Sequence, residues 1–93
     1  MGACFQAARI NAETSSEAAQ EAHRIISRLR LEYGTGAYQG HLGGTGSFEY
    51  IKLPFASIEA ARDHAEANHG KWDEPWLMRT DKGQWLLAGW CSE

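Results

Sequence analysis

The segment from residue 14 to residue 34 constrains the fold most, because it carries a helix pattern with a marked beginning and end. Thr14 and Glu17 have the spacing of a capping box, in which a hydroxyl and a carboxylate satisfy the first backbone N–H groups of a helix. Gly34 stands where a glycine often ends a helix. Small and apolar residues recur between these signals at helical spacing: Ala18, Ala22, Ile25, Leu29 and Tyr33, with Ala19 and Ile26 beside them. The pattern predicts a helix over residues 14–33 with one side against a core.

A second helix and several strands are indicated by shorter patterns. Ser57 and Gly70 enclose a segment in which apolar and charged residues alternate at helical spacing. Pro54 ends a predicted strand, because proline cannot donate to a β-ladder. The turn at residues 80–83 is typical of a hairpin. We expect strands at residues 3–10, 47–53, 76–79 and 84–91, and a further strand at 37–42.

This order of elements predicts the fold class α+β in a single domain over residues 1–93. A chain of 93 residues that is 43% hydrophobic is long enough for one small core and too short for two. We predict a two-layer sandwich, an antiparallel sheet of four to five strands with two helices on one face. The order is that of the split βαβ, ferredoxin-like motif with one extra C-terminal strand.

The hydropathy and the cysteines of the chain favour a soluble, cytoplasmic protein. No apolar run approaches the length of a membrane span, and the first residues lack the basic start and apolar stretch of a secretory signal. Cys4 and Cys91 lie near opposite ends of the chain, and in a reducing compartment we expect both to be free thiols. No Cys-x-x-Cys or Cys-x-x-His pair appears, so we expect neither a metal nor another cofactor.

Six glycines lie between residues 34 and 46, which raises the question of whether this segment binds a phosphate group. Phosphate-binding glycine loops follow a strand and open a helix, so that backbone N–H groups converge on the anion. Here the glycines follow a predicted helix and lead into a predicted strand, and the sequence contains no Gly-Lys-Ser or Gly-Lys-Thr. We therefore expect no nucleotide binding and assign the glycines to a helix end and to turns.

Catalytic motifs are missing from the sequence, which predicts a protein that is not an enzyme. No Ser or Cys stands in a nucleophile motif, and no two carboxylates are marked as an acid–base pair. His64 and His69 are five residues apart on the second predicted helix, a spacing that turns them away from each other. His69 is expected at the helix C-terminus, where the macrodipole favours a cation. Among the histidines, His41 in the glycine-rich segment has the position best suited to a ligand site.

The net charge of −3 comes from one segment. Residues 57–74 contain five acidic and two basic residues, a difference of −3, whereas acidic and basic residues are equal in number before and after this segment. All four Trp lie between residues 72 and 90, and Trp is enriched among the residues that anchor interfaces. We therefore predict a docking surface for a protein partner with a basic surface, formed by Glu59, Asp63, Glu66, Trp72, Asp73, Glu74 and Trp76.

These features predict a small, non-enzymatic protein-binding module, such as an inhibitor or regulator that docks on a larger partner. Short, acidic α+β domains without motifs resemble, in general character, the accessory and inhibitor proteins that phages and mobile elements encode, including anti-CRISPR inhibitors. No residue is carried over from this resemblance. Edge strands of so small a sheet could also pair across a two-fold axis, which leaves a homodimer open.

An alternative is a binder of a small ligand or of single-stranded nucleic acid that uses His41, Phe48 and Tyr50. Phe48 and Tyr50 alternate on a predicted strand and, with Phe5, resemble the stacking aromatics of RNA recognition motifs. The basic residue of that family's motif is missing before Gly46, and a negative net charge gives no attraction for a polyanion, so we do not expect nucleic acid. Exposure of the two aromatics on an open sheet face would favour this alternative, and burial under the helices would count against it.

Overall fold

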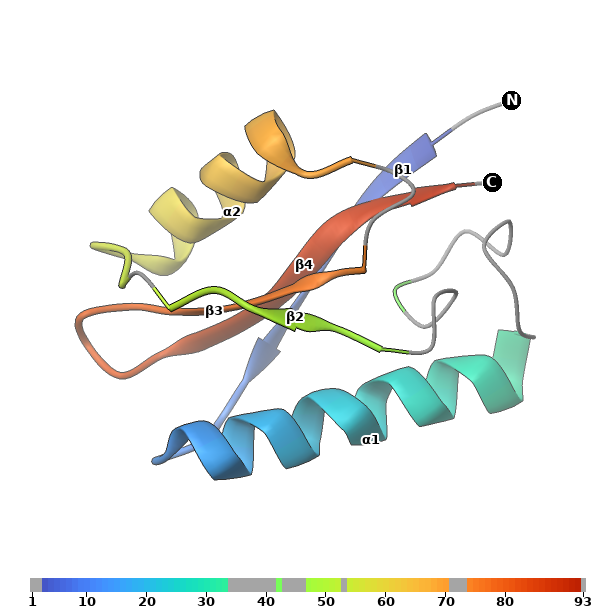
Figure 1. Ribbon diagram of the computed structural model, residues 1–93, viewed down its shortest axis with the longest axis horizontal. Helices are drawn as coiled ribbons and strands as arrows, with labels where there is room; N and C mark the ends of the chain where they lie inside the picture. The colour runs from blue at the N-terminus through green and yellow to red at the C-terminus, as the bar shows by residue number, and fades with distance from the viewer. Residues whose placement is uncertain (1–2, 34–41, 43–46, 53, 71–73, 93) are drawn as a thin grey trace.

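A four-stranded sheet with two helices forms the protein, and the computed structural model describes residues 3–33, 42, 47–52, 54–70 and 74–92. Figure 1 shows the strands between the two helices, with α2 above the sheet and α1 below it. The predicted α+β class is confirmed. In chain order the elements are β1 (Ala3–Ile10), α1 (Ser15–Tyr33), β2 (Glu49–Tyr50), α2 (Ile58–Asn68), β3 (Trp76–Arg79) and β4 (Trp85–Ser92).

Both helices begin with the capping contacts that the sequence predicts. The N–H of Glu17 donates to Thr14 Oγ1 over 3.2 Å, and the N–H of Glu13 donates to Glu17 Oε2 over 3.3 Å. At the start of α2, the N–H of Ala60 donates to Ser57 Oγ over 3.1 Å. The bonds from Glu17 and Ala60 each satisfy a backbone donor that the helix itself leaves without a partner, and the bond from Glu13 holds the residue before the cap. Among the described residues, neither helix is long and apolar enough to cross a membrane.

The sheet has the order β1-β4-β3-β2 and is mixed. β4 runs antiparallel to both of its neighbours, whereas β2 pairs parallel with β3 through Glu49–Trp76 and Tyr50–Leu77. The strands β1, β2 and β3 therefore point in one direction, and β4 alone points in the other. In this respect the structure differs from the antiparallel sheet that we predicted.

The two helices pack against opposite faces of the sheet, which is a second difference from the prediction. The chain crosses from β1 to β2 through α1 in one direction along the sheet, and it returns from β2 to β3 through α2 in the other direction. Connections between parallel strands are almost always right-handed. Two right-handed connections that run in opposite directions place their helices on opposite faces, so that the helices cannot share one.

Alternating residues of the strands supply a separate apolar cluster to each helix. On β3, Leu77 belongs to the cluster under α1, and its neighbour Met78 belongs to the cluster under α2. The same alternation on β4 gives Trp85 and Leu87 to α1, and Leu86 to α2. The helices contribute mostly small residues, so that their backbones lie close to the sheet: Ala18, Ala22 and Ile26 from α1, and Ile58, Ala61 and Ala65 from α2.

The strand predicted at residues 47–53 is reduced to two residues in β2. Beyond it, the chain follows β3 without forming a regular strand: the N–H groups of Ile51 and Phe55 donate to the carbonyls of Leu77 and Arg79. Of the strand predicted at residues 37–42, only Leu42 lies within the described part, and it is buried in the cluster under α1. The other predicted strands and the hairpin turn before β4 are observed.

Candidate functional site

Three carboxylates of the predicted docking surface lie on one side of α2. Glu59, Asp63 and Glu66 are all exposed, and their spacing of four and three residues places them on one face of the helix. The opposite face of α2 packs on the sheet through small residues. We call Glu59, Asp63 and Glu66 the acidic row.

The acidic row is not neutralised by any cation within the described part of the chain. On α1, by contrast, Arg24 lies 2.7 Å from Glu21, and Arg28 lies 3.8 Å from Glu32. Arg62 stands on α2 beside the acidic row, but its guanidinium carbon lies 5.7 Å from the centre of the Phe5 ring. The surface charges of α1 are therefore partly balanced within the helix, whereas α2 presents three carboxylates to solvent.

Two aromatic rings, from β1 and β4, lie next to the acidic row. Phe5 and Trp90 are direct partners across the β1–β4 ladder, and their ring centres are 5.4 Å apart in an edge-to-face arrangement. The indole N–H of Trp90 donates to the carbonyl of Glu66 over 2.8 Å. Phe5, Trp90 and Arg62 are not part of the predicted surface, because their proximity depends on the pairing of the first and last strands.

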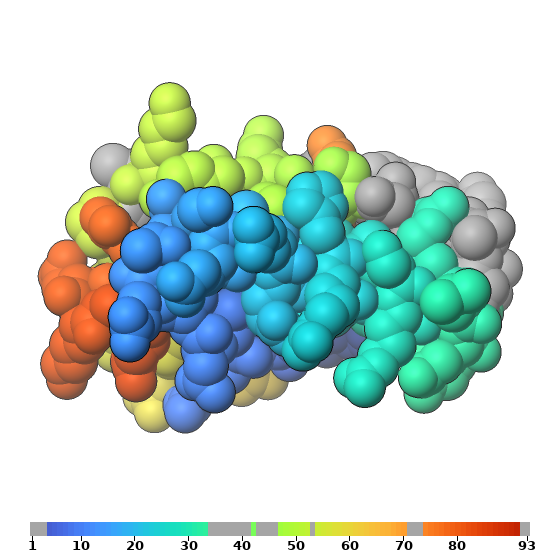
Figure 2. Space-filling view, turned by 90° about the horizontal axis from the view of Figure 1, so that it is seen from below, coloured from blue at the N-terminus to red at the C-terminus, as the bar shows by residue number. Residues whose placement is uncertain are grey.

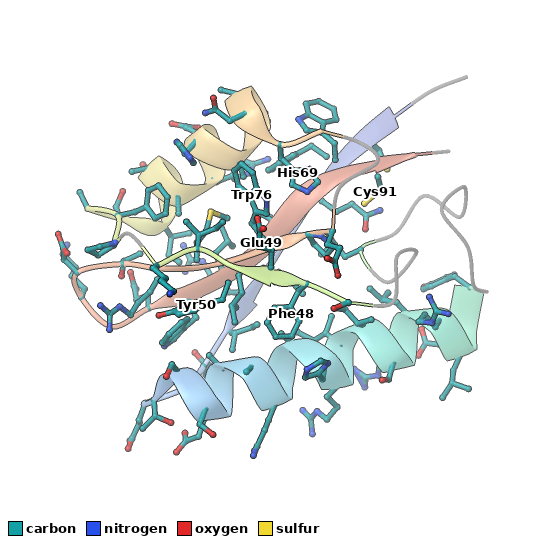
Figure 3. The ribbon with its side chains drawn as sticks, viewed as in Figure 1. Phe48, Glu49, Tyr50, His69, Trp76 and Cys91 are labelled. Carbon is teal, nitrogen blue, oxygen red and sulfur yellow. The ribbon has the colours of Figure 1, made fainter. Side chains whose placement is uncertain are left out.

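Trp76, an anchor in the predicted surface, is half-buried under α2. Its ring lies 5.7 Å from the His64 ring and 5.1 Å from the His69 ring, so much of its surface packs within the protein. Figure 3 shows Trp76 and His69 together on the α2 side of the sheet. Glu74 is exposed. Trp72 and Asp73, which complete the predicted surface, lie outside the described residues.

The His69 side chain bonds to the backbone at the end of the sheet where β3 has not yet paired with β4. If the β3–β4 register is extended from Trp76–Ala88, Glu74 lies opposite Trp90. The His69 ring lies between these two residues: the N–H of Trp90 donates to Nδ1 over 3.0 Å, and Nε2 lies 2.7 Å from the carbonyl of Glu74. Because Nδ1 accepts a hydrogen bond, the ring carries its proton on Nε2 and donates it to Glu74. His69 ends α2 as predicted, but its ring is a buried bridge between strands rather than a cation at the helix end.

Phe48 and Tyr50, the aromatics of the alternative site, lie on the α1 side of the sheet (Figure 3). Phe48 is half-buried and packs edge-to-face on His23 at 4.8 Å, whereas Tyr50 is exposed by 38% and lies 6.0 Å from the Trp85 ring. The two rings line an apolar groove of about 300 Å³ together with Ser15, Ser16, Ala19 and Leu77. His41, the third residue of this prediction, lies outside the described part of the chain.

A larger, polar hollow of about 510 Å³ lies where β1 ends and α1 begins. Arg9 lines it together with Glu13 and Glu17, and Glu17 is already engaged in the helix cap. The hollow therefore offers no clear preference for a cation or an anion. Within the described residues, no three His, Cys, Asp or Glu side chains are grouped closely enough to hold a metal ion.

Comparisons with protein-family models, with curated proteins and with solved structures found no match for this chain. A function for the chain is therefore inferred from the geometry of the site.

Proposed function

We propose that the protein is a non-enzymatic binding module that docks through α2 on a basic surface of a larger protein. The observation that carries this proposal is the acidic row, whose three exposed carboxylates have no ion-pair partner among the described residues. A partner that supplies Lys or Arg side chains would neutralise them, and complementary potentials would accelerate its association. Glu74, with the predicted Trp72 and Asp73, would extend the surface beyond the end of α2, and the exposed part of Trp76 would border it.

The acidic row contributes little to folding, which makes a binding role testable. Exposed charges alter the free energy of unfolding by only about 0.5 kcal/mol each. A regulator or inhibitor of the kind that phages encode would act in this way, by covering a basic functional surface of its target.

Charge reversal of the acidic row tests the proposal. We expect Glu59→Lys/Asp63→Lys/Glu66→Lys to fold normally, as judged by circular dichroism, and to lose a partner that the wild type captures from a nuclease-treated lysate of the host. The matched control is Glu13→Lys/Glu21→Lys/Glu32→Lys, which makes the same change in net charge on and just before α1, on the other side of the sheet from α2. The control should keep the partner. Equal capture by both triple variants would refute docking through the acidic row.

The apolar groove beside β2 favours a second candidate, binding of a small apolar ligand. Phe48, Tyr50 and Leu77 give the groove an apolar lining, and no Arg or Lys lines it within the described part of the chain. The groove therefore does not favour binding of a nucleic acid, whereas its apolar lining would suit an aromatic or aliphatic molecule. Titration of a small aromatic ligand set, followed by NMR, should shift the Phe48 and Tyr50 signals, and unchanged signals would exclude this candidate.

A further inference from the structure

The sheet has two edges that differ in how far they are protected against pairing with another chain. β2 forms one edge and is only two residues long, with Lys52 and Pro54 close behind it. Short strands, lysines and prolines are the usual protection of an edge. β1 forms the other edge over eight residues, and Arg9 is its only charged residue. Figure 2 shows β1 in dark blue on one side of α1 and the yellow-green segment around β2 on the other.

β1 is also regular along its whole length. Its pairing with β4 advances one residue at a time, from Ala3–Ser92 to Ile10–Trp85, without a bulge. β1 contains no proline, and no described strand pairs with its second edge. A long, regular edge that lacks the common protective features is suited to pairing with another strand.

The hydrogen-bond pattern shows which backbone groups of β1 face outward. The N–H of Thr80 donates to the carbonyl of Gln84, so the even-numbered residues of β4 direct their backbone groups toward β3. The odd-numbered residues of β4 therefore bond to the even-numbered residues of β1, with which they are in register. The N–H and C=O groups of Ala3, Phe5, Ala7 and Arg9 are left pointing away from the sheet.

We propose that two copies of this chain pair antiparallel through β1, which joins their sheets into one continuous sheet of eight strands, four from each copy. In a register centred on Gln6, each of residues 3–9 in one copy lies opposite a residue of the same segment in the other copy. Ala3 lies opposite Arg9 and Phe5 opposite Ala7 in hydrogen-bonded pairs, and Gln6 meets Gln6 of the second copy on the two-fold axis. The proposal does not depend on the docking function of the acidic row.

The placement of charge along β1 allows a second copy as the occupant of this edge, because the antiparallel register does not set Arg9 of one copy against Arg9 of the other. Arg9 lies on the same face of β1 as Phe5, because the two are four residues apart on a strand. Phe5 is the partner of Trp90, whose indole donates to the carbonyl of Glu66. In the proposed register, Arg9 of one copy is placed opposite Ala3 of the other and next to Phe5, on the face of the sheet that α2 covers with Arg62 and Glu66. The two-fold axis repeats this placement, so each Arg9 faces an uncharged residue across the new ladder.

Measurement of the mass in solution, with Ala7→Pro as the disrupting variant, tests the pairing. We expect sedimentation to give the wild type twice the 10.3 kDa mass of the chain. Proline at position 7 removes an outward N–H and leaves the β1–β4 ladder intact, so it should give a folded monomer. The control Ala7→Val changes the same exposed side chain but keeps the N–H, and it should remain a dimer. A wild type that is monomeric from micromolar to millimolar concentration, or a dimer that persists in Ala7→Pro, overturns the proposal.

A cross-linking experiment tests the register without a disruptive substitution. Facing residues that are not hydrogen-bonded to each other have Cα atoms about 4.5 Å apart, which is within the span of a disulfide. In a background with Cys4→Ala and Cys91→Ala, Gln6→Cys should therefore form a covalent dimer under mild oxidation. Ala8→Cys should not, because position 8 faces position 4 of the second copy. Equal cross-linking of both variants, or of neither, overturns the register centred on Gln6.

Discussion

The contact between His69 and Gly89 should couple the effects of substitutions at the two positions. A Cβ atom added at Gly89 would lie 2.7 Å from Cε1 and 2.9 Å from Nε2 of the His69 ring, closer than packed atoms approach. The φ angle of Gly89 is not positive, so its backbone conformation suits any residue. Glycine is therefore required here to make room for the ring.

The magnitudes follow from the two hydrogen bonds and this close approach. His69→Ala removes the partners of Trp90 N–H and Glu74 C=O, at about 1–3 kcal/mol for each buried group, and access of water at this nearly buried site reduces the total to about 2–4 kcal/mol. Gly89→Ala overpacks the site, which typically costs about 1–3 kcal/mol. Without the ring the added methyl group fits, and replacing a strand glycine then gains about 0.5–1 kcal/mol. We expect the double variant to be more stable than the sum of the single effects predicts, by about 1.5–4 kcal/mol, which is the cost of Gly89→Ala beside the ring plus its gain without the ring.

Equilibrium unfolding in urea, followed by Trp fluorescence at one protein concentration, measures the four free energies of this cycle. His64→Ala is the matched control, because His64 lies on the same helix but is exposed, and it should cost less than about 1 kcal/mol. If Gly89→Ala has the same cost with and without the His69 ring, the ring does not set the space at position 89. The bridging role of His69 would be refuted if His69→Ala lowered the free energy of unfolding no more than His64→Ala does.

Three further predictions concern single features of the fold. Gly83→Ala should lower the free energy of unfolding by about 1–2 kcal/mol, because φ at Gly83 is 78°, and Gly83→Asn should lower it less; equal losses would contradict this reason. Ser57→Ala should cost about 1 kcal/mol through loss of the bond from Ala60 N–H, and Ser57→Asp should retain most of the stability in the same unfolding assay. Alkylation in denaturant without reductant should modify both Cys4 and Cys91, and an unmodified pair in the mass spectrum would contradict their thiol state.

The helices were predictable because their signals are local. The Thr14–Glu17 capping box and the Ser57 cap act within four residues of sequence, and each makes the hydrogen bond that its spacing predicts. The acidic row was predictable for the same reason. Once α2 is assigned, helical periodicity alone places Glu59, Asp63 and Glu66 together.

The directions of the strands were not predictable from these local signals. β2 contributes only two residues to the ladder, and nothing in its sequence distinguishes a parallel from an antiparallel neighbour. The faces covered by the helices follow from those directions through the handedness of the connections. A wrong direction for one strand therefore changes the expected position of a whole helix.

The site residues that sequence analysis missed depend on long-range register. Phe5 and Trp90 are 85 positions apart in the chain and meet because β1 and β4 pair residue by residue. His69 reaches Trp90 because β3 starts after Glu74 and leaves one position of the ladder open. Periodicity shows which face a residue occupies but not which distant residue it meets.

The two proposals place the functional surfaces on one face of a larger assembly. Antiparallel strands of a continuous sheet are related by an axis perpendicular to that sheet, so both copies of α2 would lie on the same face and both copies of α1 on the other. One face would then carry two acidic rows, whereas the other would carry helices whose charges are partly balanced by Glu21–Arg24 and Glu32–Arg28 pairs. A partner with two basic patches would be held more tightly than by either row alone. Because Ala7→Pro leaves the acidic row unchanged and charge reversal leaves the outward backbone groups of β1 unchanged, failure of one proposal is distinguishable from failure of the other.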